Sequence, residues 1–244
     1  IQMPNTGDTW SAADSRDLGL TGERVLPIGL GTHGHGHAFG GVDRSESLTV
    51  IDRVLCSVPQ GVKVVIDTAP RYGRGSVESI LGEIIGGHAD SVLIATKGGR
   101  HIDAARDNEK DFSRSFLRAD LEGSLERLGL GKIFLYQMHN PSLAEIRQGE
   151  VFEILEDFGT EGLIDWYGVS IDTPAEGDAV LDAHRRLHLP GLTSIQAIYS
   201  ILTKWDSDGL FRRASQQGIA IIVREVLVRG LLTPRSLRYD DPRA

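Results

Sequence analysis

The stretch Asp67-Thr68-Ala69-Pro70-Arg71-Tyr72-Gly73 directly follows a short apolar, β-branched run at residues 62–66. Similar runs recur about every 30 residues, which is the length of one strand–helix unit. Amphipathic stretches with apolar residues at helical spacing lie between them. Apolar strands that alternate with helices indicate a parallel sheet covered on both faces. The sequence therefore predicts an α/β fold.

The two kinds of stretch predict the positions of the individual elements. Strands are expected at residues 26–30, 62–66, 92–96, 133–138, 164–169, 192–197 and 219–223. Helices are expected at residues 45–56, 77–85, 113–128, 150–158, 175–187 and 209–217, with Ser113 as an N-cap and Cys56 buried on an apolar helix face. No linker or low-complexity segment interrupts this pattern, which predicts a single domain over residues 1–244.

Polar side chains stand at the carboxyl ends of several predicted strands: Asp67, Lys97, His139 and Ser170. In a closed (β/α)8 barrel these ends converge on one mouth, whereas in an open sheet they are strung along an edge. An open dinucleotide-binding sheet also usually carries G-x-G-x-x-G after its first strand, and the glycines of residues 34–41 do not have that spacing. Both observations favour the (β/α)8 barrel of the TIM type.

Composition and charge narrow the classes of function. The 244 residues carry 26 basic and 34 acidic side chains, so no basic footprint for nucleic acid is present. Cys56 is the single cysteine, which excludes an intrachain disulfide and favours a cytoplasmic address. No apolar run approaches the ~20 residues that span a bilayer, so no membrane partner is expected. The sequence does not predict the oligomeric state.

The strand-end residues suggest proton transfer to a carbonyl group. A tyrosine normally keeps its proton up to about pH 10, and a nearby ammonium group lowers that pKa. Lys97 is the candidate ammonium group beside Tyr72, and Asp67 would hold Lys97 in place. His139 could orient a carbonyl oxygen. This set fits a general acid that protonates the oxygen while hydride reaches the carbon.

Several motifs in this order resemble the aldo-keto reductases. They lie at residues 16–25, 29–32, 67–82, 96–97 and 137–139, and the similarity extends over about residues 16–233. The resemblance implies an N-terminal β-hairpin below the barrel and NADPH as the hydride donor to a small-molecule carbonyl substrate. It also implies that Tyr72 is the catalytic acid, assisted by Lys97, Asp67 and His139.

The resemblance implies a cofactor site as well. Its contacts are expected at Thr32, Ser170, Gln196, Tyr199, Arg224, Leu227 and Gly230. The family often has asparagine after the serine that ends the fifth strand, but here Ile171 follows Ser170. Val226 stands where proline is common. For Tyr199, plain core packing is an alternative to stacking on the nicotinamide ring.

A loop of alternating glycine and histidine, residues 33–37, is a competing signal. Metal-dependent hydrolases with this fold use such a pair of histidines, because neutral imidazole is a common zinc ligand. They also need histidines at later strand ends, where only His139 is available. We therefore expect no metal at His33, His35 and His37, and a loop over the mouth. The resemblance implies that His33 touches the substrate, and Phe39 and Trp205 are candidates to line the mouth; a plain loop role is the alternative for all three.

Two other functions remain open on the same fold. One is a redox-neutral lyase or dehydratase that uses Tyr72 and Lys97 as acid and base, and the other is a non-catalytic binding subunit.

The C-terminal part lacks an apolar run for an eighth strand after Thr233. We therefore expect the gene product to continue past Ala244, and the last strand–helix unit to be missing from this chain. The barrel should then show a gap between its first and seventh strands. In the family the missing segment carries the residues that grip the 2′-phosphate of NADPH, so a preference for NADPH over NADH cannot be read from these residues.

Overall fold

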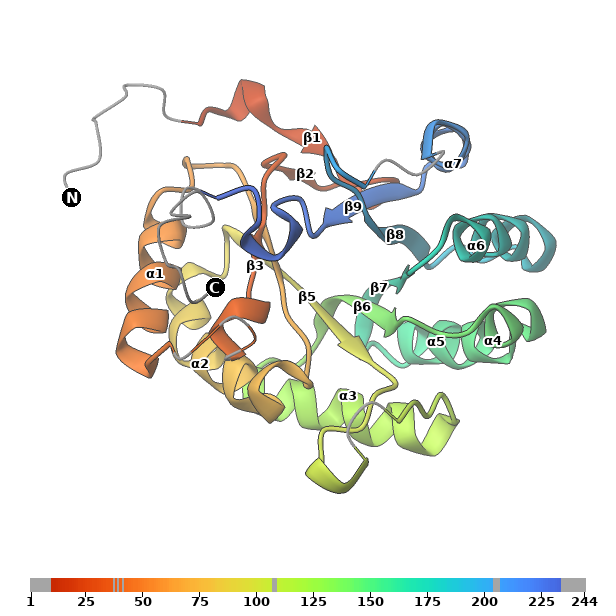
Figure 1. Ribbon diagram of the computed structural model, residues 1–244, viewed down its shortest axis with the longest axis horizontal. Helices are drawn as coiled ribbons and strands as arrows, with labels where there is room; N and C mark the ends of the chain where they lie inside the picture. Colours follow the sequence, from red (N-terminus) through yellow and green to blue (C-terminus); the bar gives the residue numbers. More distant parts are fainter. Residues whose placement is uncertain are drawn as a thin grey trace, which may run out of the picture.

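The computed structural model describes residues 10–36, 38, 40, 42–106, 109–203 and 207–233. Seven parallel strands form one sheet in the order in which they occur along the chain, as in a barrel and unlike an open sheet with a reversal point. The strands are β3 (Leu30–Gly31), β4 (Val64–Asp67), β5 (Val92–Gly98), β6 (Ile133–His139), β7 (Ile164–Ser170), β8 (Leu192–Ile198) and β9 (Ala220–Arg224). The helices lie outside the sheet (Figure 1). The predicted barrel-type fold is confirmed.

The helices follow the predicted pattern closely. They are α1 (Arg44–Cys56), α2 (Ser76–Ile84), α3 (Arg114–Leu128), α4 (Leu143–Gln148), α5 (Glu150–Thr160), α6 (Pro174–Leu187) and α7 (Ser207–Gln216). Ser113 caps α3 as expected, because its side chain accepts from the Phe116 amide. The sequence analysis missed α4, whose six residues are too few to show helical periodicity. None of the described helices is long and apolar enough to cross a bilayer.

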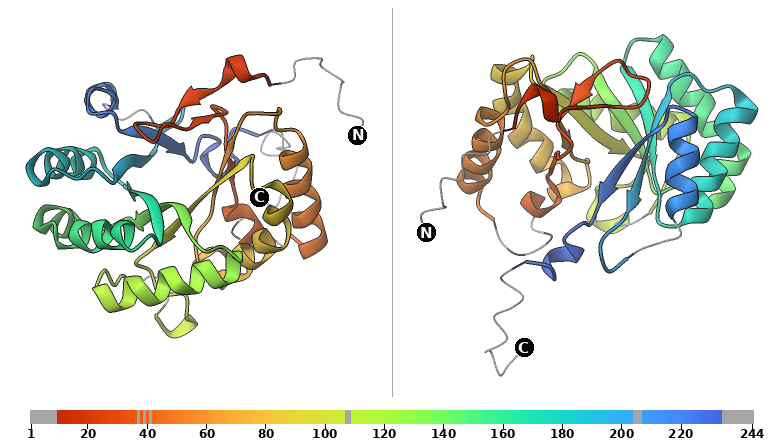
Figure 2. Two further views of the ribbon diagram at one scale, coloured as in Figure 1. Left: turned by 180° about the vertical axis from the view of Figure 1, so that it is seen from behind. Right: turned by 90° about the horizontal axis from the view of Figure 1, so that it is seen from above.

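The expected N-terminal hairpin is present. Strands β1 (Arg16–Asp17) and β2 (Arg24–Val25) pair antiparallel. Leu18 and Val25 are buried in one cluster with Val65, Leu93 and Leu135 of the barrel strands. The hairpin therefore packs on barrel residues that precede the polar strand ends, away from the mouth, as Figure 2 also shows.

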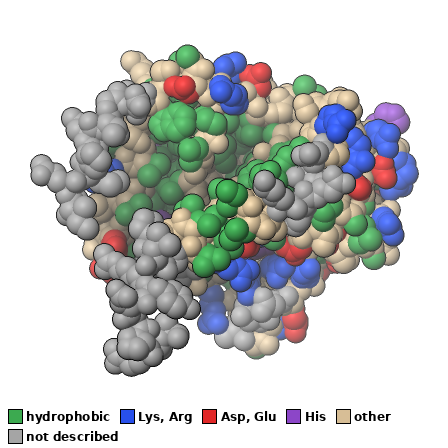
Figure 3. All heavy atoms as spheres, turned by 45° about the horizontal axis from the view of Figure 1, so that its top comes forward, with side chains coloured by type: hydrophobic (Ala, Val, Ile, Leu, Met, Phe, Trp, Pro, Cys, Tyr) green, Lys and Arg blue, Asp and Glu red, His purple; other side chains and the backbone are tan. Residues whose placement is uncertain are grey.

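The sheet has an opening between β3 and β9, as the sequence predicted. These strands stand at the two ends of the sheet order, and neither pairs with a further strand within the described residues. Large apolar side chains are exposed in the segments next to them, namely Ile28 before β3 and Val226, Leu227 and Leu231 after β9. Figure 3 shows apolar side chains gathered around a hollow. Edges of this kind leave backbone groups and apolar surface without a partner.

Cys56 is exposed, so the prediction that it is buried was wrong. The buried positions of α1 are Ser47, Ile51 and Leu55. Each helical residue turns the side chain by about 100°, so Cys56 points away from the face that ends with Leu55. Its thiol lies 3.8 Å from Asp52 Oδ1, one turn earlier on the same helix.

Candidate active site

Tyr72 begins a tight turn between β4 and α2. The turn, Tyr72–Gly75, contains three successive residues with positive φ: Gly73 at 58°, Arg74 at 53° and Gly75 at 88°. Such values are easy for glycine but unfavourable for Arg74. The turn therefore needs support from its surroundings to hold Tyr72 in place.

Lys97 connects the turn to the end of β4. Its side chain is 1% exposed, and its Nζ donates to Asp67 Oδ1 at 2.6 Å and Oδ2 at 2.7 Å. The same Nζ donates to the Thr68 carbonyl at 3.1 Å and lies 3.2 Å from Tyr72 Oη. The structure thus brings together the three predicted residues Asp67, Lys97 and Tyr72.

Burial and the charge of Lys97 act in opposite directions on the pKa of the Tyr72 phenol. Burial raises the pKa of the Tyr72 phenol, and this exceeds the lowering by Lys97, so the net shift is upward. The predicted lowering by Lys97 is therefore present, but burial outweighs it, because the sequence shows the nearby charge but not the loss of water. Burial alone would lower the pKa of Lys97, but Asp67 and Tyr72 raise it overall. At neutral pH the site thus holds a protonated phenol beside a charged ammonium group.

His139 completes the expected group. Its ring stands edge-on to the Tyr72 ring, with centroids 6.3 Å apart. Burial, followed by the positive charge of Lys97 and Arg100, holds the pKa of His139 well below its usual value. The imidazole is therefore neutral at physiological pH and can donate or accept one hydrogen bond without adding charge. Arg100 Nε donates to the His139 carbonyl at 3.1 Å, which anchors the end of β6.

The glycine–histidine loop lies beside Tyr72. The His33 ring centroid is 4.8 Å from that of Tyr72, so His33 reaches the mouth as expected. His35 Nδ1 lies 3.0 Å from Ser47 Oγ on α1 instead. The predictions for His37, Phe39 and Trp205 fall outside the described residues. A separate surface group, Asp52, Cys56 and His88, places three potential metal-ligating atoms within 4.8 Å of one another and includes none of the loop histidines.

Three of the predicted cofactor residues lie near Asp67 or on neighbouring strands. Thr32 Oγ1 donates to the Asp67 carbonyl at 2.9 Å, and Gln196 Nε2 donates to Asp67 Oδ1 at 2.7 Å. Ser170 is the register partner of both His139 and Gln196 on the adjacent strands. All three side chains are buried. The structure therefore places them in one layer at the strand ends.

Several buried polar atoms in this layer have no hydrogen-bond partner among the described residues. They are Ser170 Oγ, Gln196 Oε1, Gln137 Oε1 and Asn140 Oδ1. Buried polar atoms in native proteins are normally hydrogen-bonded, so these atoms indicate a polar ligand. A carboxamide has one carbonyl oxygen that accepts hydrogen bonds and two N–H groups that donate them. The Ser170 hydroxyl can donate to such a carbonyl oxygen, and the three side-chain amide oxygens can accept from such N–H groups. The residues present therefore fit the carboxamide of a nicotinamide ring.

The remaining predicted cofactor residues differ from one another in their contacts and exposure. The Tyr199 ring packs on Phe211 of α7, with centroids 5.5 Å apart, as in the packing alternative. Arg224 pairs with Asp172 at 2.7 Å and Glu225 at 2.8 Å, and so ties the ends of β7 and β9 together. Leu227 is 55% exposed, and Gly230 has a positive φ of 95°. The binding roles of Tyr199, Arg224, Leu227 and Gly230 remain predictions.

The sequence analysis assigned no role to two residues at the mouth. Asn140 adopts a positive φ of 57° directly after His139, and its side-chain amide donates to Asp172 Oδ1. Gln137 Nε2 donates to Asp67 Oδ1 at 3.3 Å. Both residues lie in the same strand-end segment as His139. Their position in that segment is the only feature of the sequence that could have indicated a role at the mouth.

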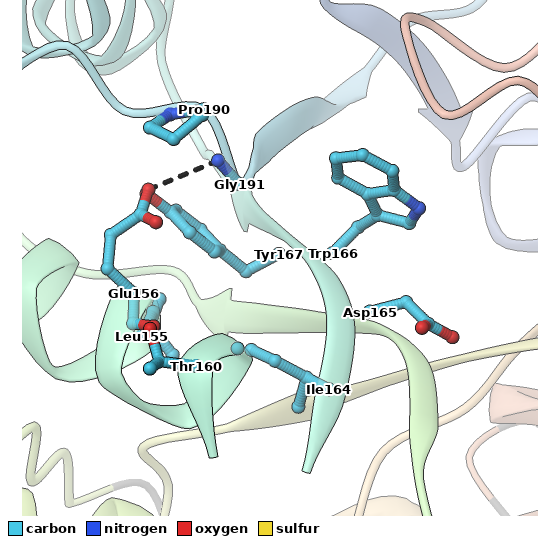
Figure 4. Close-up of a pocket in the computed structure, with 10 residues that line it drawn as sticks. Leu155, Glu156, Thr160, Ile164, Asp165, Trp166, Tyr167, Pro190 and Gly191 are labelled. Carbon is cyan, nitrogen blue, oxygen red and sulfur yellow. Dashed lines mark hydrogen bonds between the residues drawn. The ribbon is translucent and has the colours of Figure 1, made fainter. Parts of the chain in front are cut away.

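One candidate cavity lies away from these residues. It measures about 290 Å³ and is lined by the end of α5, the start of β7 and residues 190–191 (Figure 4). The start of a parallel strand is opposite its carboxyl end, so this cavity is remote from Tyr72 and Lys97. The carboxylate of Glu156 in it accepts from Tyr167 Oη at 2.6 Å and from the Gly191 amide at 3.1 Å. The cavity therefore contains a satisfied structural contact and none of the predicted catalytic groups.

Comparison with known proteins agrees with the barrel fold. The model of the Aldo/keto reductase family matches residues 27–244. The aldo-keto reductase YhdN of Bacillus subtilis (strain 168) is 32% identical over 240 residues, covering 91% of this chain and 68% of that protein. The NADH-specific methylglyoxal reductase of Escherichia coli (strain K12) is 32% identical over 235 residues, covering 88% and 68%.

Solved structures show the same relationship. The holo form of the aldo-keto reductase AKR11C1 from Bacillus halodurans has a TM-score of 0.75 and 27% identity, covering 91% of this chain and 69% of that one. The chain belongs to the aldo/keto reductase family. It is an oxidoreductase of the class that interconverts carbonyl and alcohol groups with a nicotinamide cofactor.

Proposed function

We propose that this protein reduces the carbonyl group of a small molecule with NADPH, using Tyr72 as the general acid. The observation that carries the proposal is the 3.2 Å contact between Lys97 Nζ and Tyr72 Oη. Asp67 holds the same ammonium group through both carboxylate oxygens. A protonated phenol next to a fixed positive charge is suited to giving up a proton only when a basic oxygen arrives.

Each residue has a distinct part in this proposal. The bound cofactor supplies the hydride. Neutral His139 donates a hydrogen bond that orients the substrate oxygen, and Tyr72 then gives that oxygen its proton. Lys97 stabilises the negative charge that develops on the phenol oxygen, and Asp67 keeps Lys97 charged and in position. Ser170 Oγ and Gln196 Oε1, which have no hydrogen-bond partner among the described residues, would hold the nicotinamide carboxamide.

The choice between NADPH and NADH requires a direct measurement, since one relative is named an NADH-specific enzyme. NADPH is the cofactor that the resemblance implies, and titration with each cofactor, followed by nicotinamide fluorescence, measures which of the two has the lower Kd. The proposed location is the cytoplasm, which the single cysteine favours.

The variant Tyr72→Phe tests the role of the acid. We expect it to lower carbonyl reduction by about 10²–10⁴-fold, the usual contribution of a general acid, and to leave the cofactor Kd nearly unchanged. A suitable control is Tyr167→Phe, because Tyr167 Oη donates to Glu156 in the remote cavity. Turnover above about a tenth of the wild-type value in Tyr72→Phe would show that the assignment is wrong.

The titration with cofactor also separates the proposed reductase from the two alternative functions. Cofactor binding without turnover of any aldehyde or ketone would indicate a binding subunit, and absence of binding would indicate a redox-neutral enzyme.

A further inference from the structure

Behind the active site, one buried carboxylate joins three elements. Glu78 lies in the first turn of α2 and is 0% exposed. Its Oε1 accepts from Thr96 Oγ1 of β5 at 2.6 Å, and its Oε2 accepts from Arg127 Nε of α3 at 2.8 Å. A fully buried carboxylate requires such partners, because burial without them is strongly unfavourable.

The two ends of this network adjoin the two groups of the proposed proton transfer. Thr96 directly precedes Lys97, and successive strand residues face opposite sides of the sheet. Lys97 therefore points to the mouth while Thr96 points to the helices. Glu78 follows the turn that carries Tyr72 by only a few residues. The carboxylate thus links the backbone that carries Lys97 to the backbone that carries Tyr72.

Arg127 extends this link to the turn itself. A Cβ atom at Gly75, the last residue of the turn, would lie only 2.8 Å from Arg127 Cδ. A Cβ at Gly123 would lie 2.9 Å from Arg127 Nη1. The two glycines therefore leave the space that the Arg127 side chain occupies between α3 and the turn. Helices α2 and α3 lie side by side outside the sheet (Figures 1 and 2).

The backbone conformation of the turn explains why it needs this support. Gly73 and Gly75 adopt their positive φ values easily, but the φ of 53° at Arg74 between them is unfavourable for a residue with a side chain. On the other side of Lys97, Asp120 Oδ2 of α3 accepts from the Gly99 amide at 3.0 Å. The strand is thus held by α2 just before Lys97 and by α3 just after it.

We propose that Glu78, Thr96 and Arg127 are positioning residues that set the separation of Tyr72 Oη and Lys97 Nζ through the backbone. This inference rests on the proposed function of Tyr72 and Lys97. It does not require any of the three to touch substrate or cofactor. A displacement of about 1 Å between reacting groups can cost about a hundredfold in rate, so loss of the link should appear in kcat.

The mildest test is Thr96→Val, which removes the hydroxyl donor at nearly constant size. We expect kcat for reduction to fall by at least about threefold, with the cofactor Kd unchanged. Thr96→Ser retains the hydroxyl and should restore kcat to near the wild-type value. Thr193→Val is the matched control, because Thr193 is also a buried strand threonine but belongs to β8, which is not a neighbour of β5 in the sheet. Glu78→Gln should act in the same direction, and Thr96→Val remains decisive if that variant does not fold.

A purely structural role would give a different result. In that case Thr96→Val would lower Tm while kcat stayed within about threefold of the wild type, and this outcome would overturn the proposal. Failure of Thr96→Ser to restore kcat would overturn it as well.

Amide hydrogen exchange keeps this test separate from the proposed function. If the wild-type protein reduces no carbonyl compound, the proposed function fails by itself. Faster exchange at residues 72–76 in Thr96→Val, but not in Thr193→Val, would still support the coupling of strand and turn. Unchanged exchange there would refute it.

Discussion

Replacing Lys97 with methionine removes the ammonium group between Asp67 and Tyr72 while leaving an unbranched side chain of similar length. At the observed 3.2 Å, the attraction between Lys97 Nζ and a full negative charge on Tyr72 Oη is about 5 kcal/mol, for an effective dielectric constant of about 20. If half of that charge develops in the transition state, the loss is about 2.5 kcal/mol, or roughly 70-fold in kcat.

The same substitution should also affect stability. Lys97 is 1% exposed and Asp67 is 19% exposed, so the variant leaves a largely buried carboxylate without its counterion. Breaking a buried ion pair from one side costs about 3–5 kcal/mol, and the partial exposure of Asp67 favours the lower value. The double variant Asp67→Asn/Lys97→Met removes the stranded charge, and should recover much of the stability but none of the activity.

Steady-state kinetics at neutral pH and urea unfolding of the single and double variants measure these two effects separately. Lys132→Met is a suitable control, because Lys132 is 48% exposed and pairs with Asp165 at the strand starts. A kcat for Lys97→Met within about fivefold of the wild type would refute the reasoning, as would a double variant no more stable than the single one.

Two further predictions concern protonation, and a third concerns metal binding. Because burial raises the pKa of Tyr72 and reduction needs its protonated form, the decline of kcat in a profile from pH 6 to 11 should be centred above pH 10; a decline centred below pH 10 would contradict this. Burial raises the pKa of Asp120 to about 7 from 3.8, so the folded state keeps a proton that the unfolded state loses, and stability should fall by up to about 4 kcal/mol from pH 4 to pH 7. Urea unfolding of Asp120→Asn should lack this slope, and parallel curves for variant and wild type would disprove it. Elemental analysis of protein purified without a histidine tag should find no stoichiometric metal at His33 and His35; one zinc per chain, lost together with activity in His35→Ala, would favour the hydrolase interpretation.

Much of the fold could be predicted because its signals are local. The apolar runs and helical periodicity place six of the seven described α-helices to within a few residues. The chain order of the strands follows from their regular spacing, and parallel strands direct their carboxyl ends to one mouth. For that reason Asp67, Lys97 and His139, far apart in the sequence, could be assigned to one site together with Tyr72.

The tertiary structure alone decided what depends on burial and on contacts between distant residues. The sequence shows that a cation is near Tyr72, but the sign of the pKa shift depends on how far water is excluded. The contact between Tyr199 and Phe211 depends on how α7 packs beside the end of β8, which periodicity does not specify. The link from Glu78 to Thr96 and Arg127 joins three elements, and it exists only where their packing brings one carboxylate to both partners.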